Sequence, residues 1–511
     1  MWKCKMQRSA SSAPAVNFQA LPAFTATLYR RRNHPGKILC LVTVLALAFA
    51  GQAFRASAQT EVNLHSFGGL PDGENPRPGL VRASDGNFYG TTYSGGTNSS
   101  GTVFRLTPGG GYASLYSFGG QPFDGAHPSA GLVQGSDGYL YGTTVYGGPD
   151  DFGTVFRISL SGSYSNLYSF QGPPGDGENP AVGLTRGSDG FLYGVTMKGG
   201  AGNFGTVFRF TPDGTETMLY SFAGSPNDGF EPLTALVLGR DGNFYGTTTF
   251  GGLDTYDGAT DTNSLGLGTM FRISPGGSYQ VLYLFGSAFP DGLDPGQLVQ
   301  ASDGNFYGVA YEGGTFTNHG AIFRITPGGS ESLVYSFGSQ PGDGSNPSSL
   351  IVGSDGNFYG TTTTGGTNNI GAVFRISRGG SETVLYSFGS QPNDGNEPLG
   401  WLVQGNGENF YGTTLKGGAG NGTLFELTVP LNVPTNQITS IQITPSASFV
   451  FTIYSVANET YQLQFSPSFS PLVWGNVPGA SVTSSNDGPL TLTNSMGPLG
   501  LHGFFRVSIS P

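Results

Sequence analysis

Apolar residues occur in short runs along most of the chain, and each run is bounded by Gly, Pro, Asp or Asn. The first four runs occupy residues 79–82, 87–92, 102–106 and 113–118. Runs of this length that are rich in Phe, Tyr, Val and Thr, and that end at turn residues, predict β-strands. Between the first two runs, Asp85-Gly86 supplies the positive φ angles that a two-residue hairpin turn requires. The pattern therefore predicts four short antiparallel strands.

The four-strand pattern returns seven times. The Tyr-Gly pair of its second strand begins at Tyr89, Tyr141, Tyr193, Tyr245, Tyr307, Tyr359 and Tyr411. Successive copies are 52 residues apart, except that 62 residues separate the fourth copy from the fifth. A double glycine, a strand of the form GTVFR and a strand of the form LYSF follow the same period. Such a fixed period is the signature of a repeat architecture.

The size of the unit and the ends of the array indicate a closed ring. Four strands in about 50 residues match one β-propeller blade, whereas a β-solenoid coil is usually much shorter. The seventh unit stops after Phe425-Glu426 without an LYSF strand, and Leu64-His65-Ser66-Phe67 precedes the first unit. An open array would need capping repeats, while ring closure removes exposed sheet edges. We therefore expect an all-β fold with seven blades, in which residues 61–67 form the outer strand of the seventh.

One position of the innermost strand is expected to face the ring axis. Its residues are Gly79, Gly131, Gly183, Ala235, Gln297, Ser349 and Trp401. Small residues suit a crowded axis, and the recurring Phe and Tyr residues are expected to fill the space between blades. Trp401 is the exception, and it is predicted either to plug the channel or to pack against a neighbouring blade.

The repeated phrases resemble a known family. SDGNFYGTT, the double glycine, GTVFR, and LYSF followed by DGxxP together are similar to the GloVer tandem repeat of exported bacterial "choice-of-anchor" proteins. The resemblance covers residues 61–428 and implies export, but it brings no catalytic residues. The seventh copy departs from the pattern at Gly407-Glu408 and at Glu426, which suits a closing blade.

Two further segments flank the repeats. Residues 1–58 contain Arg30, Arg31 and Arg32, the apolar run 38–50 and an Ala-Ser-Ala pattern ending at Ala58, which together predict a secretory signal peptide. The run is too short to span a bilayer comfortably, so no membrane span is expected after cleavage. The propeller is expected over residues 59–430, a linker over 431–437, and a small C-terminal β-sandwich of about six strands over 438–511.

Charge and cysteine usage narrow the class of partner. All 33 acidic residues but only 14 of the 22 basic ones follow residue 58, so the mature chain carries a net charge of −19. That balance argues against nucleic acid and suits cations or uncharged polymers. Both cysteines, Cys4 and Cys40, lie in the leader, so the exported chain, expected to be a monomer, must be stabilised by packing rather than by disulfides.

Two sets of carboxylates are candidate site residues. The first residue of each DGxxP phrase is Asp72, Asp124, Asp176, Asp228, Asp291, Asp343 or Asp394. Together on one face of the ring they offer oxygen ligands for Ca²⁺, although Asp before Gly is also ordinary turn chemistry. The extended loop of the fourth unit, which causes the 62-residue spacing, carries Asp254, Asp257 and Asp261. With Trp401, this loop is the candidate binding site, unless it is a plain solvated insertion.

Catalytic motifs are absent from the sequence: no GxSxG, HExxH or phosphate-binding loop occurs. We therefore predict an exported, non-enzymatic propeller that binds a polysaccharide or a protein at or outside the cell surface, without a cofactor unless Ca²⁺ binds. The alternative is a secreted carbohydrate-active hydrolase or lyase that uses carboxylates on the DGxxP face.

Overall fold

The computed structural model describes residues 60–429, except 253–266, 288–289 and 317–318, together with short strands before and after this region. All regular elements of the described residues are β-strands, and none of these residues forms a helix that could cross a membrane. Chain contacts separate Ala53–Val433 as one compact unit from a second unit made of Met1–Gln52 and Pro434–Pro511.

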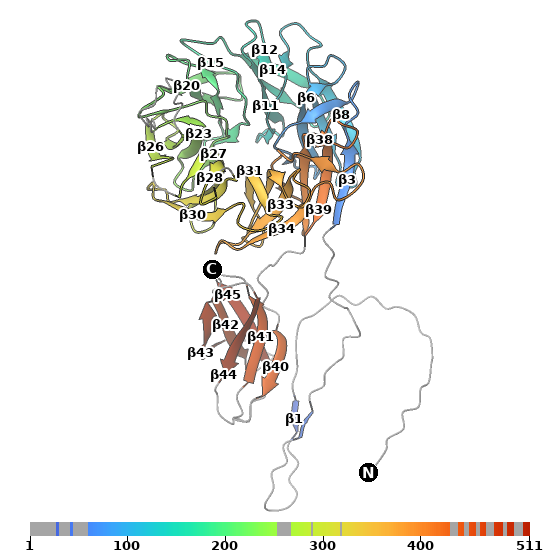
Figure 1. Ribbon diagram of the computed structural model, residues 1–511, viewed down its shortest axis with the longest axis vertical. Helices are drawn as coiled ribbons and strands as arrows, with labels where there is room; N and C mark the ends of the chain where they lie inside the picture. The colour runs from blue at the N-terminus through green and yellow to red at the C-terminus, as the bar shows by residue number, and fades with distance from the viewer. Residues whose placement is uncertain are drawn as a thin grey trace, which may run out of the picture. The chain divides into compact units, whose positions relative to one another are not determined.

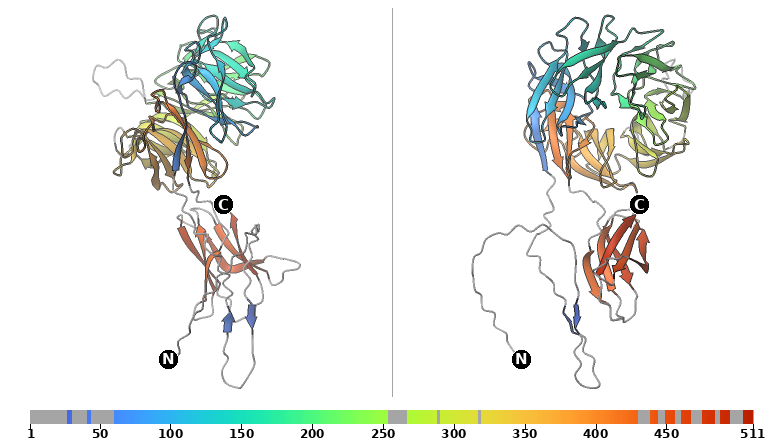
Figure 2. Two further views of the ribbon diagram at one scale, coloured as in Figure 1. Left: turned by 90° about the vertical axis from the view of Figure 1, so that its right-hand side faces the viewer. Right: turned by 180° about the vertical axis from the view of Figure 1, so that it is seen from behind.

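The unit Ala53–Val433 is a seven-bladed β-propeller (Figures 1 and 2). In the first blade, β5 (Val81–Arg82), β6 (Phe88–Gly95), β7 (Thr102–Leu106) and β8 (Tyr112–Ser117) run from the axis outward, and β4 (Gly73–Pro76) extends the sheet along β6. The ring of seven units predicted from the period is confirmed.

Blades two to six repeat this plan. Blade two consists of β9 (Gly125–Ala126), β10 (Val133–Gln134), β11 (Leu140–Thr144), β12 (Tyr146–Gly147), β13 (Thr154–Ile158) and β14 (Tyr164–Ser169). Blade three consists of β15 (Gly177–Glu178), β16 (Thr185–Arg186), β17 (Leu192–Thr196), β18 (Lys198–Gly199), β19 (Thr206–Phe210) and β20 (Glu216–Ser221). Blade four consists of β21 (Gly229–Phe230), β22 (Val237–Leu238), β23 (Phe244–Thr248), β24 (Phe250–Gly251), β25 (Thr269–Ile273) and β26 (Tyr279–Leu284). Blade five consists of β27 (Gly292–Gln300), β28 (Phe306–Gly313), β29 (Ala321–Ile325) and β30 (Glu331–Ser336). Blade six consists of β31 (Gly344–Val352), β32 (Phe358–Gly365), β33 (Ala372–Ile376) and β34 (Glu382–Ser387).

The seventh blade joins the two ends of the repeat region. Its strand order is β36 (Val403–Gln404), β37 (Asn409–Thr414), β39 (Thr423–Thr428) and β3 (Thr60–Ser66), and β35 (Gly395–Asn396) pairs with β38 (Lys416–Gly417) beside it. Strand β3 is antiparallel to β39, with Val62 opposite Glu426, and the two lie side by side in Figure 1 although they come from opposite ends. Residues 61–67 therefore close the ring.

The contacts within the recurring hairpin explain why its residues recur. Gly86 adopts a φ of 83°, which favours glycine, but Asp85 is not at positive φ. The prediction of a two-residue turn was wrong: β5 ends at Arg82 and β6 begins at Phe88, and the Ala83 amide donates to the Asn87 carbonyl. The Oδ1 of Asp85 accepts a hydrogen bond from the Asn87 amide at 3.1 Å, and its Oδ2 accepts one from the Tyr89 hydroxyl at 2.8 Å. The Asp, Asn and Tyr of the phrase thus hold one turn together.

Aromatic residues pack between blades, as expected. Tyr193 of blade three stacks on Phe244 of blade four with ring centroids 4.0 Å apart, and both side chains are fully buried. Phe222 meets Phe271 edge to face across the same boundary at 5.4 Å. Large apolar rings bury the most area per residue, so each boundary acts as a separate hydrophobic core.

The innermost strands depart from the expectation. The run 79–82 forms only the two-residue strand β5, because Gly79 has a φ of 100° and turns the chain away from an extended ladder. Blades five and six keep continuous inner strands of nine residues instead, so the rim of the axis differs between the two sides of the ring.

The second unit contains the remaining described strands. They are β1 (Thr27–Tyr29) paired with β2 (Leu41–Thr43), and two three-stranded sheets ordered β40-β41-β44 and β43-β42-β45. The bounds of the latter are β40 (Ile438–Ile443), β41 (Phe449–Ser455), β42 (Thr460–Ser466), β43 (Gly475–Thr483), β44 (Gly488–Asn494) and β45 (Phe504–Ser510).

Candidate functional site

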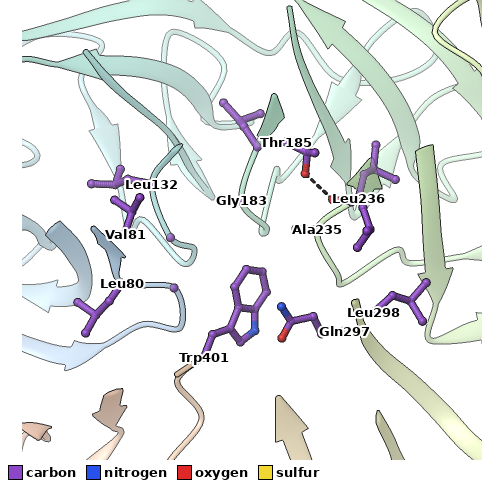
Figure 3. Close-up of a pocket in the computed structure, with 14 residues that line it drawn as sticks. Leu80, Val81, Leu132, Gly183, Thr185, Ala235, Leu236, Gln297, Leu298 and Trp401 are labelled. Carbon is purple, nitrogen blue, oxygen red and sulfur yellow. Dashed lines mark hydrogen bonds between the residues drawn. The ribbon is translucent and has the colours of Figure 1, made fainter. Parts of the chain in front are cut away.

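A cavity of about 210 Å³ lies where the inner strands meet at the ring axis (Figure 3). Five leucines line it, one from each of blades one to five, and six of the seven predicted axial positions also line it. Its lining residues are Gly79, Leu80, Val81, Gly131, Leu132, Gly183, Leu184, Thr185, Ala235, Leu236, Val237, Gln297, Leu298 and Trp401.

Close backbone contact explains the small residues on one side of this cavity. A Cβ placed on Gly131 would lie 2.3 Å from the carbonyl oxygen of Gly79, and one on Gly79 would lie 2.6 Å from the Cα of Gly131. No side chain fits between blades one and two at this level, so glycine is required there. Ser349, the seventh axial position, is fully buried and its hydroxyl lies 2.9 Å from that of Thr361.

Trp401 and Gln297 are the two large side chains that reach the centre. They come from blades seven and five, and Figure 3 shows the indole and the amide side by side in the cavity. Trp401 lines the axial cavity and also lies beside blade one, because a Cβ placed on Gly79 would be 3.7 Å from its Cε3, so the structure agrees with both predicted placements. The Oε1 of Gln297 is a buried acceptor that has no hydrogen-bond partner within the described residues. A buried acceptor of this kind costs free energy until a donor reaches it.

The described lining of the cavity is uncharged. None of the fourteen described residues that line it carries an acid, a base or a thiol. Its polar side chains are the Trp401 indole, the Gln297 amide and the hydroxyl of Thr185, which donates to the carbonyl of Leu236. Such groups orient a ligand by hydrogen bonds but do not supply general acid or base catalysis.

The seven DGxxP aspartates are bound to their own turns. Asp124 is 8% exposed, and its Oδ1 accepts a hydrogen bond from the Gly125 amide at 2.8 Å. Its Oδ2 accepts from the Tyr116 hydroxyl at 2.8 Å and from the Gly119 amide at 3.0 Å. The carboxylate therefore joins the end of the LYSF strand to the next blade.

The other copies use the same contacts. Tyrosine hydroxyls donate to Asp176, Asp228, Asp291, Asp343 and Asp394, at distances of 2.7–3.0 Å. On β3 of the seventh blade His65 replaces this tyrosine, and its Nε2 lies 2.9 Å from Asp72. Within the part of the chain that the structure describes, no three His, Cys, Asp or Glu side chains gather as metal ligands would. The structure spaces the seven carboxylates one per blade and does not bring them together.

The fourth-unit loop lies outside the described residues, and with it the predicted site residues Asp254, Asp257 and Asp261.

Sequence reasoning missed a second position that recurs in every blade. It is the residue of the outer strand that pairs with the residue after the Arg of the GTVFR phrase, or after Glu426 in the seventh blade. These residues are Glu61, Tyr112, Tyr164, Glu216, Tyr279, Glu331 and Glu382. Each of these side chains faces the DGxxP aspartate of the preceding blade. Alignment of the seven copies would have shown the exchange of Tyr for Glu, but not the blade that it faces.

The four glutamates in this position have unusual acidity. Burial, together with the charge of the facing aspartate, raises the pKa of Glu61, Glu216 and Glu331 to about 7. The same causes raise the pKa of Glu382 to about 8. Burial disfavours a charged carboxyl, and a like charge nearby adds to the effect.

Several solved structures are similar to the chain at low identity. A polysaccharide lyase described as an ulvan lyase bound to -[GlcA(1-4)Rha3S]- is 9% identical, with 73% of this chain and 96% of that chain covered and a TM-score of 0.48. PorZ, a surface component of the type-IX secretion system of Porphyromonas gingivalis, is 13% identical, with 85% and 57% covered and a TM-score of 0.44. The extracellular domain of what is described as a hybrid two-component system from B. thetaiotaomicron is 13% identical, with 88% and 59% covered and a TM-score of 0.46.

No curated protein matches the chain at a significant level. The model of the Gloeobacter/Verrucomicrobia repeat matches residues 36–260 and 253–447, which together make up most of the sequence. These matches cover all seven blades, and they agree with the resemblance seen in the repeated phrases. The chain therefore belongs to the Gloeobacter/Verrucomicrobia repeat family.

Proposed function

We propose that this protein is an exported, non-enzymatic propeller that binds an uncharged carbohydrate in its axial cavity. The observation that carries this proposal is the meeting of Trp401 and Gln297 in a cavity whose described lining has no titratable group. An indole offers a flat apolar face for the C–H side of a sugar, and a planar amide offers one acceptor and two donors for its hydroxyls.

The size of the cavity favours a sugar over a protein segment. Its volume of about 210 Å³ is below the ~300–1,000 Å³ of pockets that hold drug-sized ligands. A single sugar unit, or the end of a glycan chain, is therefore the ligand that best suits it. The unpartnered Oε1 of Gln297 would accept a hydroxyl hydrogen of that unit.

Charge and export support the same ligand class. A net charge of −19 after residue 58 repels polyanions such as nucleic acid, while a neutral glycan meets no such barrier. The predicted signal peptide within residues 1–58 would place the protein outside the cytoplasm, as a monomer at or beyond the cell surface. We further infer that the two sheets of residues 438–511 pack as a β-sandwich, separate from the binding function.

The alternative is a carbohydrate-active enzyme that uses the DGxxP carboxylates. Against it, each of these aspartates already accepts hydrogen bonds from its own turn, and the same arrangement occurs in every blade. A single active site would not normally recur seven times. The alternative remains a measurable outcome, because an enzyme would release new reducing ends or unsaturated sugars.

Binding of the full-length protein to an array of neutral oligosaccharides, followed by calorimetry on the best glycan, tests the proposal. The repeat itself supplies matched variants: Trp401→Ala places the residue of position 235 in the seventh blade, and Gln297→Ser places that of position 349 in the fifth. Each should weaken binding at least tenfold, with little change in unfolding midpoint. Binding that is unchanged in both variants would refute the axial site, and turnover abolished by Asp124→Asn would establish the enzyme instead.

A further inference from the structure

The seven seams between blades are closed in two chemically different ways. The outer strand of each blade places either a tyrosine or a glutamate against the DGxxP aspartate of the blade before it. Tyr112, Tyr164 and Tyr279 face Asp72, Asp124 and Asp228, whereas Glu61, Glu216, Glu331 and Glu382 face Asp394, Asp176, Asp291 and Asp343. Since the seven positions have the same strand register, tyrosine and glutamate can be compared at equivalent positions of one chain.

The Tyr279 seam shows what a side chain at this position can do. The Tyr279 hydroxyl donates a hydrogen bond of 2.6 Å to Oδ1 of Asp228, and the Tyr279 ring stacks on Tyr220 at 3.7 Å between centroids. Burial and the charge of the facing aspartate raise the pKa of Tyr279 above its usual range, so the phenol stays neutral. A neutral donor directed at a carboxylate therefore closes this seam, whereas the buried hydroxyls of Tyr112 and Tyr164 face their aspartates without a hydrogen-bond partner within the described residues.

In the glutamate seams, a carboxyl group occupies the strand position from which Tyr279 donates its hydrogen bond. Tyrosine hydroxyls also face each pair: Tyr386 beside Glu61, Tyr168 beside Glu216, Tyr283 beside Glu331 and Tyr335 beside Glu382. Each of these hydroxyls donates to the aspartate of its pair. The ion pairs found in the described part of the chain, Lys416–Glu397 and His65–Asp72, involve none of the four glutamates. No neighbouring cation is thus seen to neutralise a second negative charge.

Burial makes two ionised carboxylates costly at these seams. Glu61 is only 9% exposed, and the Oε1 atoms of Glu61, Glu331 and Glu382 are buried without a hydrogen-bond partner within the described residues. The Tyr386 hydroxyl, which donates to Asp394 at 2.7 Å, also lies 3.5 Å from Oε2 of Glu61. Two carboxyl groups that share such a site retain one proton between them.

We propose that four of the seven blade seams are each closed by one proton shared between a glutamic acid and the aspartate of the preceding blade, and that loss of these protons loosens the ring. This device is independent of the proposed glycan site, which lies at the axis. One of the four, Glu61 with Asp394, sits on the strand that closes the ring, so the ring would open there first.

The direction of the pH effect follows from linkage. Each glutamate pKa rises from 4.5 in the unfolded chain to about 7, or about 8 for Glu382, so the folded ring binds more protons in this interval. The stabilisation is fully present below pH 4.5 and is lost as the pH rises through the folded-state values. A shift from 4.5 to about 7 corresponds to at most about 300-fold per site in the unfolding equilibrium constant. Solvent screens these part-exposed groups, so we expect about tenfold per site.

The test is urea unfolding of the full-length protein from pH 5 to pH 9. The variants are Glu216→Gln, Glu216→Tyr and the fourfold Glu→Gln change at positions 61, 216, 331 and 382. Gln is a neutral donor of similar shape, and Tyr is the residue that other blades use. Exposed Glu408→Gln is the control, because its side chain lies on a turn.

We expect the unfolding equilibrium constant of the wild type and of Glu408→Gln to rise between pH 5 and pH 9. In each single Glu216 variant this rise should be about tenfold smaller, and it should be smallest in the fourfold variant. If the fourfold variant does not fold, the two single variants decide the question. A pH dependence equal to that of the wild type in both single variants would overturn the proposal. So would a wild type whose stability at pH 9 is restored by 2 mM CaCl₂ while Glu216→Gln shows no response, because a bridging cation would then close the seams.

Discussion

Replacement of one DGxxP aspartate tests whether these carboxylates hold the turns. In Asp124→Asn, the residue keeps one acceptor oxygen, but its amide nitrogen would face the donors that Oδ2 now serves, the Tyr116 hydroxyl and the Gly119 amide. A hydrogen bond to a charged group contributes about 1.5–3 kcal/mol, and two would be lost at a side chain that is 8% exposed. We therefore expect a loss of about 2–4 kcal/mol in the free energy of unfolding, since relaxation of the turn recovers a part.

The assay is urea denaturation followed by circular dichroism, in 1 mM EDTA and in 2 mM CaCl₂. Asp150→Asn is the matched control, because Asp150 is an exposed aspartate of the adjoining blade two, and it should change stability by less than about 0.5 kcal/mol. A variant as stable as the wild type in EDTA, together with calcium stabilisation of the wild type alone, would refute the reasoning. Asp124 would then be a metal ligand rather than a turn residue.

Three further predictions address packing and acidity. Phe67→Ala, at a fully buried ring of the closing segment, should cost about 3–5 kcal/mol in urea unfolding, whereas Val62→Ala, at a site that is 51% exposed, should cost little. Gly131→Ala should cost about 1–3 kcal/mol, because its Cβ would meet the Gly79 backbone, and an equal effect of Gly109→Ala, which has open space, would contradict this. Burial and the hydrogen bond to Asp85 raise the pKa of Tyr89 to about 12. Tyr89→Phe should therefore remove tyrosinate absorbance at 295 nm that appears only above about pH 11.

The period of the sequence was sufficient to predict the blades and their closure. Leu64-His65-Ser66-Phe67 before the first unit matches the strand missing after Phe425-Glu426, and strand pairing leaves few other places for it. The hairpin phrase was equally readable, because Asp-Gly and the following Tyr form a local turn. Local chemistry that recurs in each copy can therefore be predicted from the amino-acid sequence.

The contacts between blades could not be predicted from the sequence in this way. Gln297 and Trp401 lie over 100 residues apart, and they meet only because the ring brings blades five and seven to one axis. The Glu216 seam was missed for a related reason: its partner Asp176 belongs to the previous copy, and its acidity depends on burial. A sequence gives the residue types at such positions, but burial and distance arise from closure of the ring.

Closure of the ring by β3 is the central claim, and a disulfide tests it most directly. Val62→Cys and Glu426→Cys, in a chain that lacks Cys4 and Cys40, would place two thiols on directly opposite residues of β3 and β39. Cross-strand partners have Cβ atoms about 4.5–5.5 Å apart, near the reach of a disulfide. Val62→Cys with Arg375→Cys is the control, because Arg375 holds the same position in blade six. We predict a monomeric, intramolecular disulfide in the first pair alone; free thiols or intermolecular dimers there, or equal cross-linking in the control, would contradict the closed ring.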